Sequence, residues 1–477
     1  MKTAPMKHQL AALEHLAAAP TFYALGAEQG TGKTWMLLAD LERQWLAGSV
    51  QGALVIAPKG VHINWTLREI PTHMSCRVQC EYWLSGGGVK RQRKMERLLR
   101  IDSVMEIPIL TMNVDAVNTK AGFDFAQRFL RTFRSMMIVD ESQRIKNPAA
   151  KRTKRVIQLG QEAVSRRISS GTLVSNSPMD LFSQYDFLSP GLLGTTSYRA
   201  FVAEYADLLP PDHPLLRSIG GRGTPQVVRK DEQGRPVYRN LDKLSALMKP
   251  HTYRVTKAEC LDLPAKIYQT HWFELEASQQ RIYQQLKEQL RFEHPDGTDT
   301  FTALTIINKL RQVTSGFILR DGEPTELAAC APRMQALEEL VNDCQGSVII
   351  WASFREELRQ IAQRLRHHGV VEYHGGTSSG DRERAVDEFQ RGNAKIFIGN
   401  PAAAGTGLTL HAAETVIYYS SSYSLEQRLQ SEDRAHRIGT KKPVVYIDLV
   451  ATNTIDERIA AALQSKTFVA QSILSEL

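Results

Sequence analysis

The sequence predicts an α/β protein with two parallel-sheet lobes. Short apolar runs rich in β-branched residues alternate with longer segments of helical periodicity, a pattern typical of parallel sheets covered by helices on both faces. The pattern occurs once in each half of the 477-residue chain. The expected strands are residues 22–25, 53–57, 107–111 and 136–139 in the first half, and residues 347–352, 395–399, 415–419 and 444–449 in the second.

The chain between the two halves has a different composition. Residues 210–240 are dense in glycine and proline, which favour turns and irregular backbone, and residues 226–239 could form a hairpin. Residues 276–292 and 301–314 show helical periodicity. We therefore expect helical and irregular insertions between the lobes. The predicted divisions are a first lobe at 1–200, an insertion and linker at 201–265, and a second lobe at 266–477 with a helical insertion at about 276–330.

The composition excludes several classes of protein. Lys and Arg number 59 and Asp and Glu 51, so the formal net charge of +8 weakly favours a polyanionic partner. An odd and sparse set of five cysteines argues against a disulfide framework and for a reducing compartment. No apolar run reaches the roughly 18 residues of a membrane-spanning helix, and the first residues lack the apolar stretch of a signal peptide. We expect a cytoplasmic protein without membrane contact.

Basic residues cluster at two places in the first half. One cluster lies within residues 90–100, which hold a single acidic residue, Glu96, beside Lys90, Arg91, Arg93, Lys94, Arg97 and Arg100. The other lies at residues 151–155. Each cluster could be a solvated helix face or a surface that contacts phosphates.

A glycine-rich segment at residues 27–34 follows the first expected strand and opens an apolar helix. Gly30 and Gly32 would let backbone N–H groups curl round phosphate oxygens. Lys33 could reach the β- and γ-phosphates, and the Thr34 hydroxyl could hold Mg²⁺. This context of strand, glycine-rich turn and helix is that of a P-loop, and the alternative is an ordinary glycine turn before a helix.

Two carboxylates end the expected strand at residues 136–139. Asp140 could bind Mg²⁺ through water, and Glu141 could position or activate an attacking water. Acidic residues after a strand are also common on ordinary surfaces. In company with the P-loop, the pair predicts a Walker B element.

Arg434 and Arg437 stand three residues apart in the second half, so on a helix they share one face. An exposed, ion-paired helix would suit their neighbours Glu432 and Asp433. In the alternative interpretation the two arginines reach across the cleft between the lobes and neutralise charge on the transferring phosphoryl group.

Taken in order, these motifs resemble those of superfamily-two helicase ATPases, and within that group the Snf-type DNA translocases related to chromatin remodellers. The resemblance runs through nearly the whole chain. In the first half it includes residues 5–13 with Gln9, the P-loop, 54–59 followed by Trp65, 109–113, 140–147 and 170–176. In the second half it includes residues 373–376, 382–389, 405–408 and 430–439.

The resemblance implies RecA-like lobes, ATP and Mg²⁺ as cofactors, and ATP hydrolysis stimulated by nucleic acid. It implies nucleotide contacts by Gln9, Gly30, Thr31, Gly32, Lys33, Thr34, Gly405 and Gly407, Mg²⁺ contacts by Thr34 and Asp140, and catalytic roles for Lys33, Asp140, Glu141, Arg434 and Arg437. The candidate DNA contacts are Lys59, Trp65, Thr111, Lys146, Ser170, Thr172, Thr406 and Thr409. For Trp65, burial in the core is the competing expectation.

The chain departs from the family pattern at a few positions. Gln143 stands where the family usually has His, which predicts a looser contact between the nucleotide site and the motif at residues 170–176. Leu173, Thr409 and Thr440 also replace usual residues, but no departure removes a catalytic group. The length resembles minimal bacterial or bacteriophage members, so a bacterial cytosol or phage-infected cell is the expected location.

Three functions compete at this level. The first is a duplex-tracking DNA translocase that remodels forks, anneals strands or strips proteins; the second is a strand-separating DNA or RNA helicase; the third is a binding module that uses ATP as a switch. The carboxylates and both arginines argue against the third. The resemblance at Lys146-Asn147 and at residues 430–439 favours the first. DNA, largely independent of sequence, is the expected partner, RNA is the alternative, and protein partners stay open.

Overall fold

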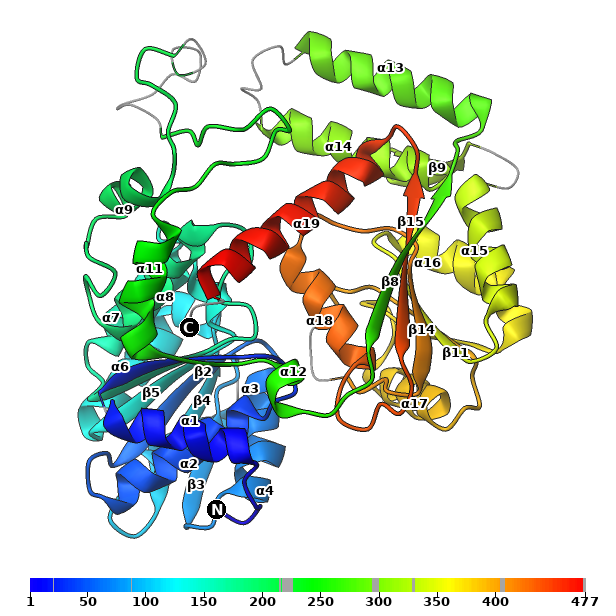
Figure 1. The fold of residues 1–477 in the computed structure, drawn as a ribbon. Coiled ribbons are helices and arrows are strands. Elements are labelled where there is room, and N and C mark those ends of the chain that lie inside the picture. Colours follow the sequence, from blue (N-terminus) through cyan, green and yellow to red (C-terminus); the bar gives the residue numbers. More distant parts are fainter. Residues whose placement is uncertain are drawn as a thin grey trace. The chain divides into compact units, whose positions relative to one another are not determined.

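The chain folds into two units, seen in a computed structural model that describes residues 1–19, 21–86, 88–213, 216, 226–293, 300–327, 331–403 and 408–474 (Figure 1). Unit 1 comprises Met1–Leu208, Val228–Asp262 and Thr467–Leu477, and unit 2 comprises Leu209–Val227 and Leu263–Lys466. The segment expected as a linker therefore contributes Val228–Asp262 to unit 1. The α/β class and the two parallel sheets predicted from the sequence are confirmed.

Unit 1 is built on a seven-stranded parallel sheet of order β3-β4-β2-β5-β6-β1-β7. Its strands are β1 (Phe22–Ala27), β2 (Gly52–Ala57), β3 (Val78–Tyr82), β4 (Ile107–Asn113), β5 (Ser135–Asp140), β6 (Ser165–Ser169) and β7 (Thr252–Val255). The four apolar strands were predicted. Strand β6 was not predicted, because it contains the charged residues Arg166 and Arg167. Arg167 is fully buried, and its Nε donates to Asp40 Oδ2 at 2.9 Å.

Helices cover both faces of this sheet. They are α1 (Lys7–Ala18), α2 (Lys33–Leu46), α3 (Val61–Asn64), a π-helical turn (Trp65–Glu69), α4 (Ile70–His73), α5 (Val89–Leu98), α6 (Lys120–Thr132), α7 (Lys151–Gly160), α8 (Leu181–Leu188), α9 (Tyr198–Tyr205), α11 (Leu241–Met248) and α12 (Lys257–Cys260). Alternate residues of each strand enter opposite cores. In β2, for example, Val55 packs in the core with α2, and Leu54 packs in the core with α6 and α7.

Unit 2 is built on a six-stranded parallel sheet of order β12-β13-β11-β14-β15-β8, again with a core on each face. Its strands are β8 (Lys266–Phe273), β11 (Ser347–Trp351), β12 (Val370–Tyr373), β13 (Ile396–Gly399), β14 (Ala413–Tyr418) and β15 (Val444–Ala451), and β9 (Phe317–Arg320) forms a separate antiparallel pair with β10 (Glu323–Glu326). The helices are α13 (Ala277–Glu293), α14 (Thr300–Thr314), α15 (Pro332–Asp343), α16 (Arg355–Arg364), α17 (Ser379–Gln390), α18 (Leu425–Ala435) and α19 (Ile455–Leu474), of which the last part, from Thr467 on, belongs to unit 1.

The segments predicted as insertions also take form. Helices α13 and α14 confirm the helical periodicity at residues 276–292 and 301–314. A backbone bridge between Lys230 and Pro236 confirms the hairpin, and bridges from Ala206 to Tyr238 and from Leu208 to Val228 tie it to the chain after α9. Across the described ranges, no helix is both long enough and apolar enough to cross a membrane.

Candidate active site

The turn between β1 and α2 has the backbone of a phosphate-binding loop. Gly30 and Gly32 adopt φ angles of 84° and 83°, in the left-handed region that glycine enters freely. A Cβ on Gly32 would stand 2.3 Å from Gln9 Nε2, so this position has no room for a side chain. Helix α2 begins at Lys33, directly after the turn, and points its N-terminal N–H groups toward the loop.

Helix α1 is fixed to this loop by two neighbouring side chains. Gln9 Nε2 donates to the carbonyl oxygen of Thr31 at 3.4 Å, and His8 Nε2 donates to the same oxygen at 2.8 Å. Thr31 Oγ1 in turn donates to the carbonyl of Glu28 at 2.8 Å. The structure therefore places Gln9, predicted to contact the nucleotide, beside the P-loop, together with His8, which carried no signal in the sequence.

Lys33 lies inward at the base of the loop, with 9% of its surface exposed. Its Nζ donates to the carbonyl of Glu28 at 3.4 Å. Gly171 closes the other side, since a Cβ there would stand 2.8 Å from Gln29 Cγ and 3.5 Å from Lys33 Nζ. The strand end that carries Gly171 thus packs against the P-loop.

Asp140 is held at the end of β5 by two side-chain donors and by the backbone N–H of Glu141, which donates to Oδ1 at 3.1 Å. Ser169 Oγ donates to Asp140 Oδ1 at 2.7 Å, and Trp65 Nε1 donates to Oδ2 at 3.0 Å. Trp65 is only 1% exposed, so in this structure it has no surface with which to contact DNA. Its indole orients the carboxylate that is expected to bind Mg²⁺.

Glu141 follows with an unusual backbone. Its φ and ψ of 52° and 57° lie in the left-handed region, which costs a non-glycine residue about 1–3 kcal/mol. Gln143 Nε2 donates to Glu141 Oε2 at 2.8 Å, and Gln29 Nε2 donates to Oε1 at 3.4 Å. The fold therefore aims this carboxylate toward the P-loop and holds it there.

Gln143 also reaches the strand end beyond β6. Ser170 Oγ donates to Gln143 Oε1 at 2.7 Å, and the backbone N–H of Thr172 donates to Ser170 Oγ at 2.8 Å. The looser contact predicted from the replacement of His at this position is wrong. A Gln amide has a donor and an acceptor end, so it can bridge a carboxylate and a hydroxyl at once.

We expect Gln143→Ala to lower kcat for ATP hydrolysis by about ten- to a hundredfold, because Glu141 would lose the donor that orients it. Nucleotide affinity should stay close to that of the parent. Steady-state hydrolysis and titration with a fluorescent nucleotide would measure the two effects separately. Gln158→Ala, on the exposed face of α7, is the matched control, and an unchanged kcat in Gln143→Ala would contradict the orienting role.

The other predicted DNA contacts of unit 1 differ in exposure. Lys59 is exposed at the end of β2, and Lys146 Nζ bonds Ser175 Oγ at 2.6 Å. Thr111 and Ser170 are fully buried. Thr111 Oγ1 donates to the carbonyl of His62 at 2.8 Å. Of this set, Lys59 has the surface that a phosphate contact requires, and the buried members make internal hydrogen bonds.

In unit 2, the two predicted arginine fingers converge on one short segment. Arg434 Nη1 and Arg437 Nη1 donate to the carbonyl of Leu408 at 3.4 and 3.0 Å, and Arg437 Nη1 also donates to Thr409 Oγ1 at 2.8 Å. Burial lowers the pKa of Arg437 from its ordinary value. Gly405, Thr406 and Gly407, which precede this segment, lie outside the described residues.

The second half of α18 is buried, unlike the exposed ion-paired helix considered from the sequence. Glu432 is 3% exposed and accepts hydrogen bonds from Lys266, Tyr268 and Arg428 at 3.2, 2.7 and 2.7 Å. Burial alone would raise the pKa of Glu432, but the charges of Lys266 and Arg428 outweigh it and hold the pKa below its ordinary value. The acidic residue thus anchors the helix that carries the arginines.

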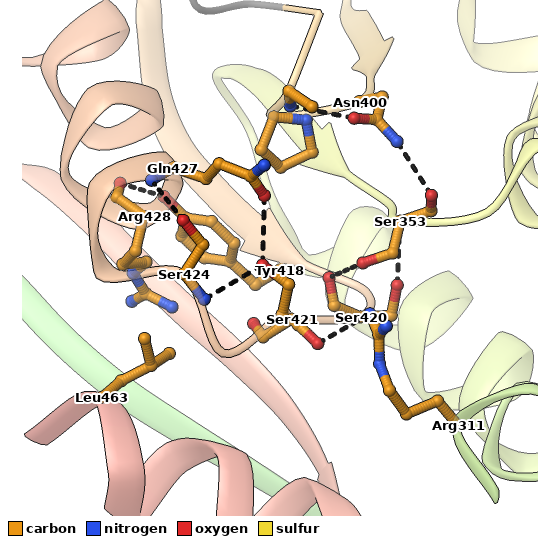
Figure 2. Close-up of a pocket in the computed structure, with 13 residues that line it drawn as sticks. Arg311, Ser353, Asn400, Tyr418, Ser420, Ser421, Ser424, Gln427, Arg428 and Leu463 are labelled. Atoms are coloured by element: carbon orange, nitrogen blue, oxygen red, sulfur yellow. Dashed lines mark hydrogen bonds between the residues drawn. The ribbon is translucent and has the colours of Figure 1, made fainter. Parts of the chain in front are cut away.

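A polar pocket of about 220 Å³ opens at the carboxyl ends of β11, β13 and β14 (Figure 2). Asn400 Nδ2 donates to the carbonyl of Ser353 at 2.8 Å, and Ser353 Oγ donates to the carbonyl of Ser420 at 3.2 Å. Ser424, the N-cap of α18, lines the same pocket. Ligands of open α/β sheets bind at such strand ends, so this is the polar edge of unit 2.

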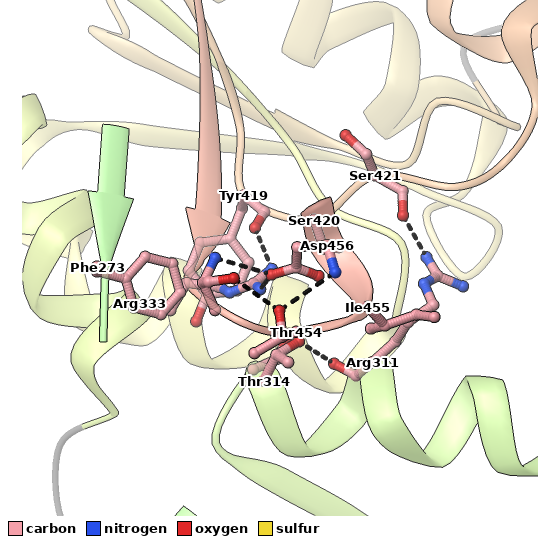
Figure 3. Close-up of polar contacts among 12 residues, drawn as sticks. Phe273, Arg311, Thr314, Arg333, Tyr419, Ser420, Ser421, Thr454, Ile455 and Asp456 are labelled. Carbon is pink, nitrogen blue, oxygen red and sulfur yellow. Dashed lines mark hydrogen bonds and ion pairs between the residues drawn. The ribbon is translucent and has the colours of Figure 1, made fainter. Parts of the chain in front are cut away.

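Arg333 and Arg311 both donate to backbone carbonyls of the chain between β14 and α18 (Figure 3). Arg333 is 1% exposed, pairs with Asp456, and donates to the carbonyl of Tyr419 at 2.6 Å. Arg311 Nη2 donates to the carbonyl of Ser421 at 2.9 Å. The sequence offered no signal for either contact, because each joins segments about a hundred residues apart.

The P-loop, the acidic strand end and the arginine-bearing helix, on two parallel-sheet units, define a P-loop protein of the two-lobed helicase class. The chain belongs to the SNF2-related family: the model of the SNF2-related domain matches residues 8–317, and that of the helicase conserved C-terminal domain matches residues 332–439. The predicted resemblance is confirmed.

Individual relatives are distant. The chain is 27% identical to "Protein CHROMATIN REMODELING 24" of Arabidopsis thaliana, over 91% of this chain and 43% of that protein. It is 24% identical to an "Uncharacterized ATP-dependent helicase" of Mycoplasma pneumoniae, over 95% of this chain and 40% of that protein. The chain therefore spans less than half the length of these curated relatives. A solved SWI2/SNF2 ATPase core of Sulfolobus solfataricus in complex with dsDNA shares 23% identity, covers 100% of this chain and 94% of its own, and has a TM-score of 0.41.

Proposed function

We propose that this chain is an ATP-driven motor that hydrolyses ATP while it tracks along DNA. The observation that carries the proposal is the network around Glu141, in which Gln143 and Gln29 hold the carboxylate beside a P-loop where Gly32 leaves no room for a side chain. An intact catalytic carboxylate argues for turnover over a binding module that uses ATP as a switch.

The residues present suit ATP with Mg²⁺. Lys33 and the loop N–H groups would hold the phosphates, Gln9 would contact the base, and Thr34 and Asp140 would hold the metal, which supplies charge neutralisation at the phosphates. Trp65 and Ser169 fix Asp140 for that task. Arg434 and Arg437 would neutralise charge on the γ-phosphate.

The segment between the predicted motifs at residues 405–408 and 430–439 favours a duplex-tracking translocase over a strand-separating helicase. A helicase normally needs a rigid wedge at the fork, often a hairpin in the second lobe. Within residues 408–435, all of which the structure describes, β14 is the single strand and α18 begins at Leu425. The hairpin around Lys230 and Pro236 is the observation that keeps the helicase as the second candidate.

Rates of ATP hydrolysis measured in parallel with duplex, single-stranded and forked DNA and with RNA would test the proposal. We expect the strongest stimulation by duplex or forked DNA, and ATP-driven displacement of a triplex strand. Opening a duplex costs on average about 1.4 kcal/mol of stacking per base-pair step, so an unaided motor should stall on a long one. Efficient release of strands of several tens of base pairs would support the helicase, and stimulation by RNA alone would overturn the DNA assignment.

A further inference from the structure

Helix α5 of unit 1 carries a row of cations that neither the fold nor the nucleotide site uses. Lys90, Arg93, Lys94 and Arg97, here called the basic stripe, stand at i, i+3, i+4 and i+7, so they share one face of the helix. All four are exposed. Within the described ranges no acidic side chain pairs with any of them: Glu96 pairs with Arg128 and Glu81 with Arg91.

The basic stripe lowers the stability of helix α5. Like charges three and four residues apart repel one another along a helix. The first turn of α5 has no acidic residue, so Lys90 and Arg91 stand unfavourably at the positive end of the helix dipole. Burial of Met95 and Leu98 holds the helix in place. The unpaired cations destabilise α5 and make no compensating ion pair within the described residues. A polyanionic ligand would supply the missing negative charge, so we infer that the stripe binds one.

The stripe begins at the carboxyl edge of the unit 1 sheet, the edge that carries exposed Lys59. Strand β3 pairs with β4 so that Tyr82 stands opposite Thr111, and the backbone N–H of the next residue, Trp83, donates to the carbonyl of Thr111 at 2.8 Å. Arg91 ties the first turn of α5 to that point, with its guanidinium 3.8 Å from the centre of the Tyr82 ring. Exposed Lys59 lies at the carboxyl end of β2 on the same edge.

We propose that the basic stripe of α5 is a further contact surface for DNA, which binds the phosphate backbone and extends the track beyond the motif residues. The inference rests on the proposed function. The stripe rises about 10 Å along the helix axis, a length over which duplex DNA carries about six phosphates. A helix that binds a membrane surface would place several large apolar side chains in the interface, whereas Met95 and Leu98 of α5 are buried in the protein and Val89, at its first position, is exposed.

The test is the variant K90Q/R93Q/K94Q/R97Q, because Gln keeps helix propensity and removes four charges. Binding of a 40-base-pair duplex, measured by fluorescence anisotropy at several salt concentrations, should weaken at least tenfold. The magnitude of the slope of log K against log salt should fall by about 3.6, since each of the four phosphate contacts would contribute about 0.9. The matched control is R359Q/R364Q/R391Q/K442Q, which removes four exposed cations of unit 2, each already in a surface ion pair. Basal ATP hydrolysis without DNA should equal that of the parent in both variants.

Each outcome decides something. Weaker binding and a lower slope in the stripe variant, but not in the control, would support the proposal. If the stripe variant bound DNA with the same affinity and salt slope as the parent, the basic stripe would not be a DNA contact surface. The proposed motor function would be unaffected by that result. A parent that neither binds DNA nor is stimulated by it would overturn the motor and the surface together. Phosphatidylserine vesicles form a parallel arm: loss of vesicle binding with unchanged DNA binding would reassign the stripe to membranes.

Discussion

Glu141→Gln should abolish ATP turnover and leave ATP binding close to that of the parent. The substitution keeps the size of the side chain and an oxygen that can accept from Gln143 or Gln29, but it removes the base that would activate water. General-base catalysis contributes about 10²–10⁴ in rate, so kcat should fall at least a hundredfold. Phosphate release under saturating ATP and titration with a fluorescent nucleotide would measure both quantities.

Two further variants serve as comparisons for Glu141→Gln. Lys33→Ala should also abolish turnover, but through weakened binding of the phosphates. Glu162→Gln, at a surface carboxylate paired with Arg131, should change neither quantity. A Glu141→Gln protein that hydrolysed ATP at the parental rate would remove Glu141 from its assigned role.

The strands that sequence reasoning found are the apolar ones in the middle of each sheet. Those it missed are polar or lie toward the edges: β6 contains buried Arg167, whose charge is balanced by Asp40, and β8 is an edge strand with Tyr268 and Trp272 exposed. Hydrophobic periodicity reports burial against apolar neighbours, so it does not register a strand whose buried residue is an ion pair.

The candidate site also contains features that the sequence predicts and features that it does not. The P-loop and the carboxylates follow from local patterns of a few residues, and the structure assembles them as expected. The contacts from Trp65 and Ser169 to Asp140 join residues 75 and 29 positions apart, and no local pattern encodes such a distance. Gln143 shows the limit most clearly, because the residue type alone suggested a looser contact, whereas in the structure Gln143 contacts both Glu141 and Ser170.

Arg437→Ala should lower kcat by about 10³–10⁵, the range that arginine fingers supply in phosphoryl transfer, and should weaken nucleotide binding far less. The structure offers a reason to expect a specific role. Burial lowers the pKa of Arg437, yet the side chain contacts the segment of Leu408 and Thr409 through neutral acceptors. Asp433 acts against this shift, but the two hydrogen-bond acceptors recorded for Arg437 Nη1 are neutral oxygens, so the guanidinium can still attract an anionic ligand. Arg437→Lys should fail to restore the rate, because an ammonium lacks the planar fork.

The competing explanation is that Arg437 only holds the chain around Leu408, and the same variants separate the two. A structural role predicts a lower melting temperature and weaker nucleotide binding with little change in kcat, since correctly folded molecules would still turn over. A finger predicts a large loss in kcat at a melting temperature near that of the parent. Arg391→Ala, at an exposed residue of unit 2 with a surface ion pair, should change neither and calibrates both measurements. A fall in nucleotide affinity without a fall in kcat would assign Arg437 to the architecture of unit 2.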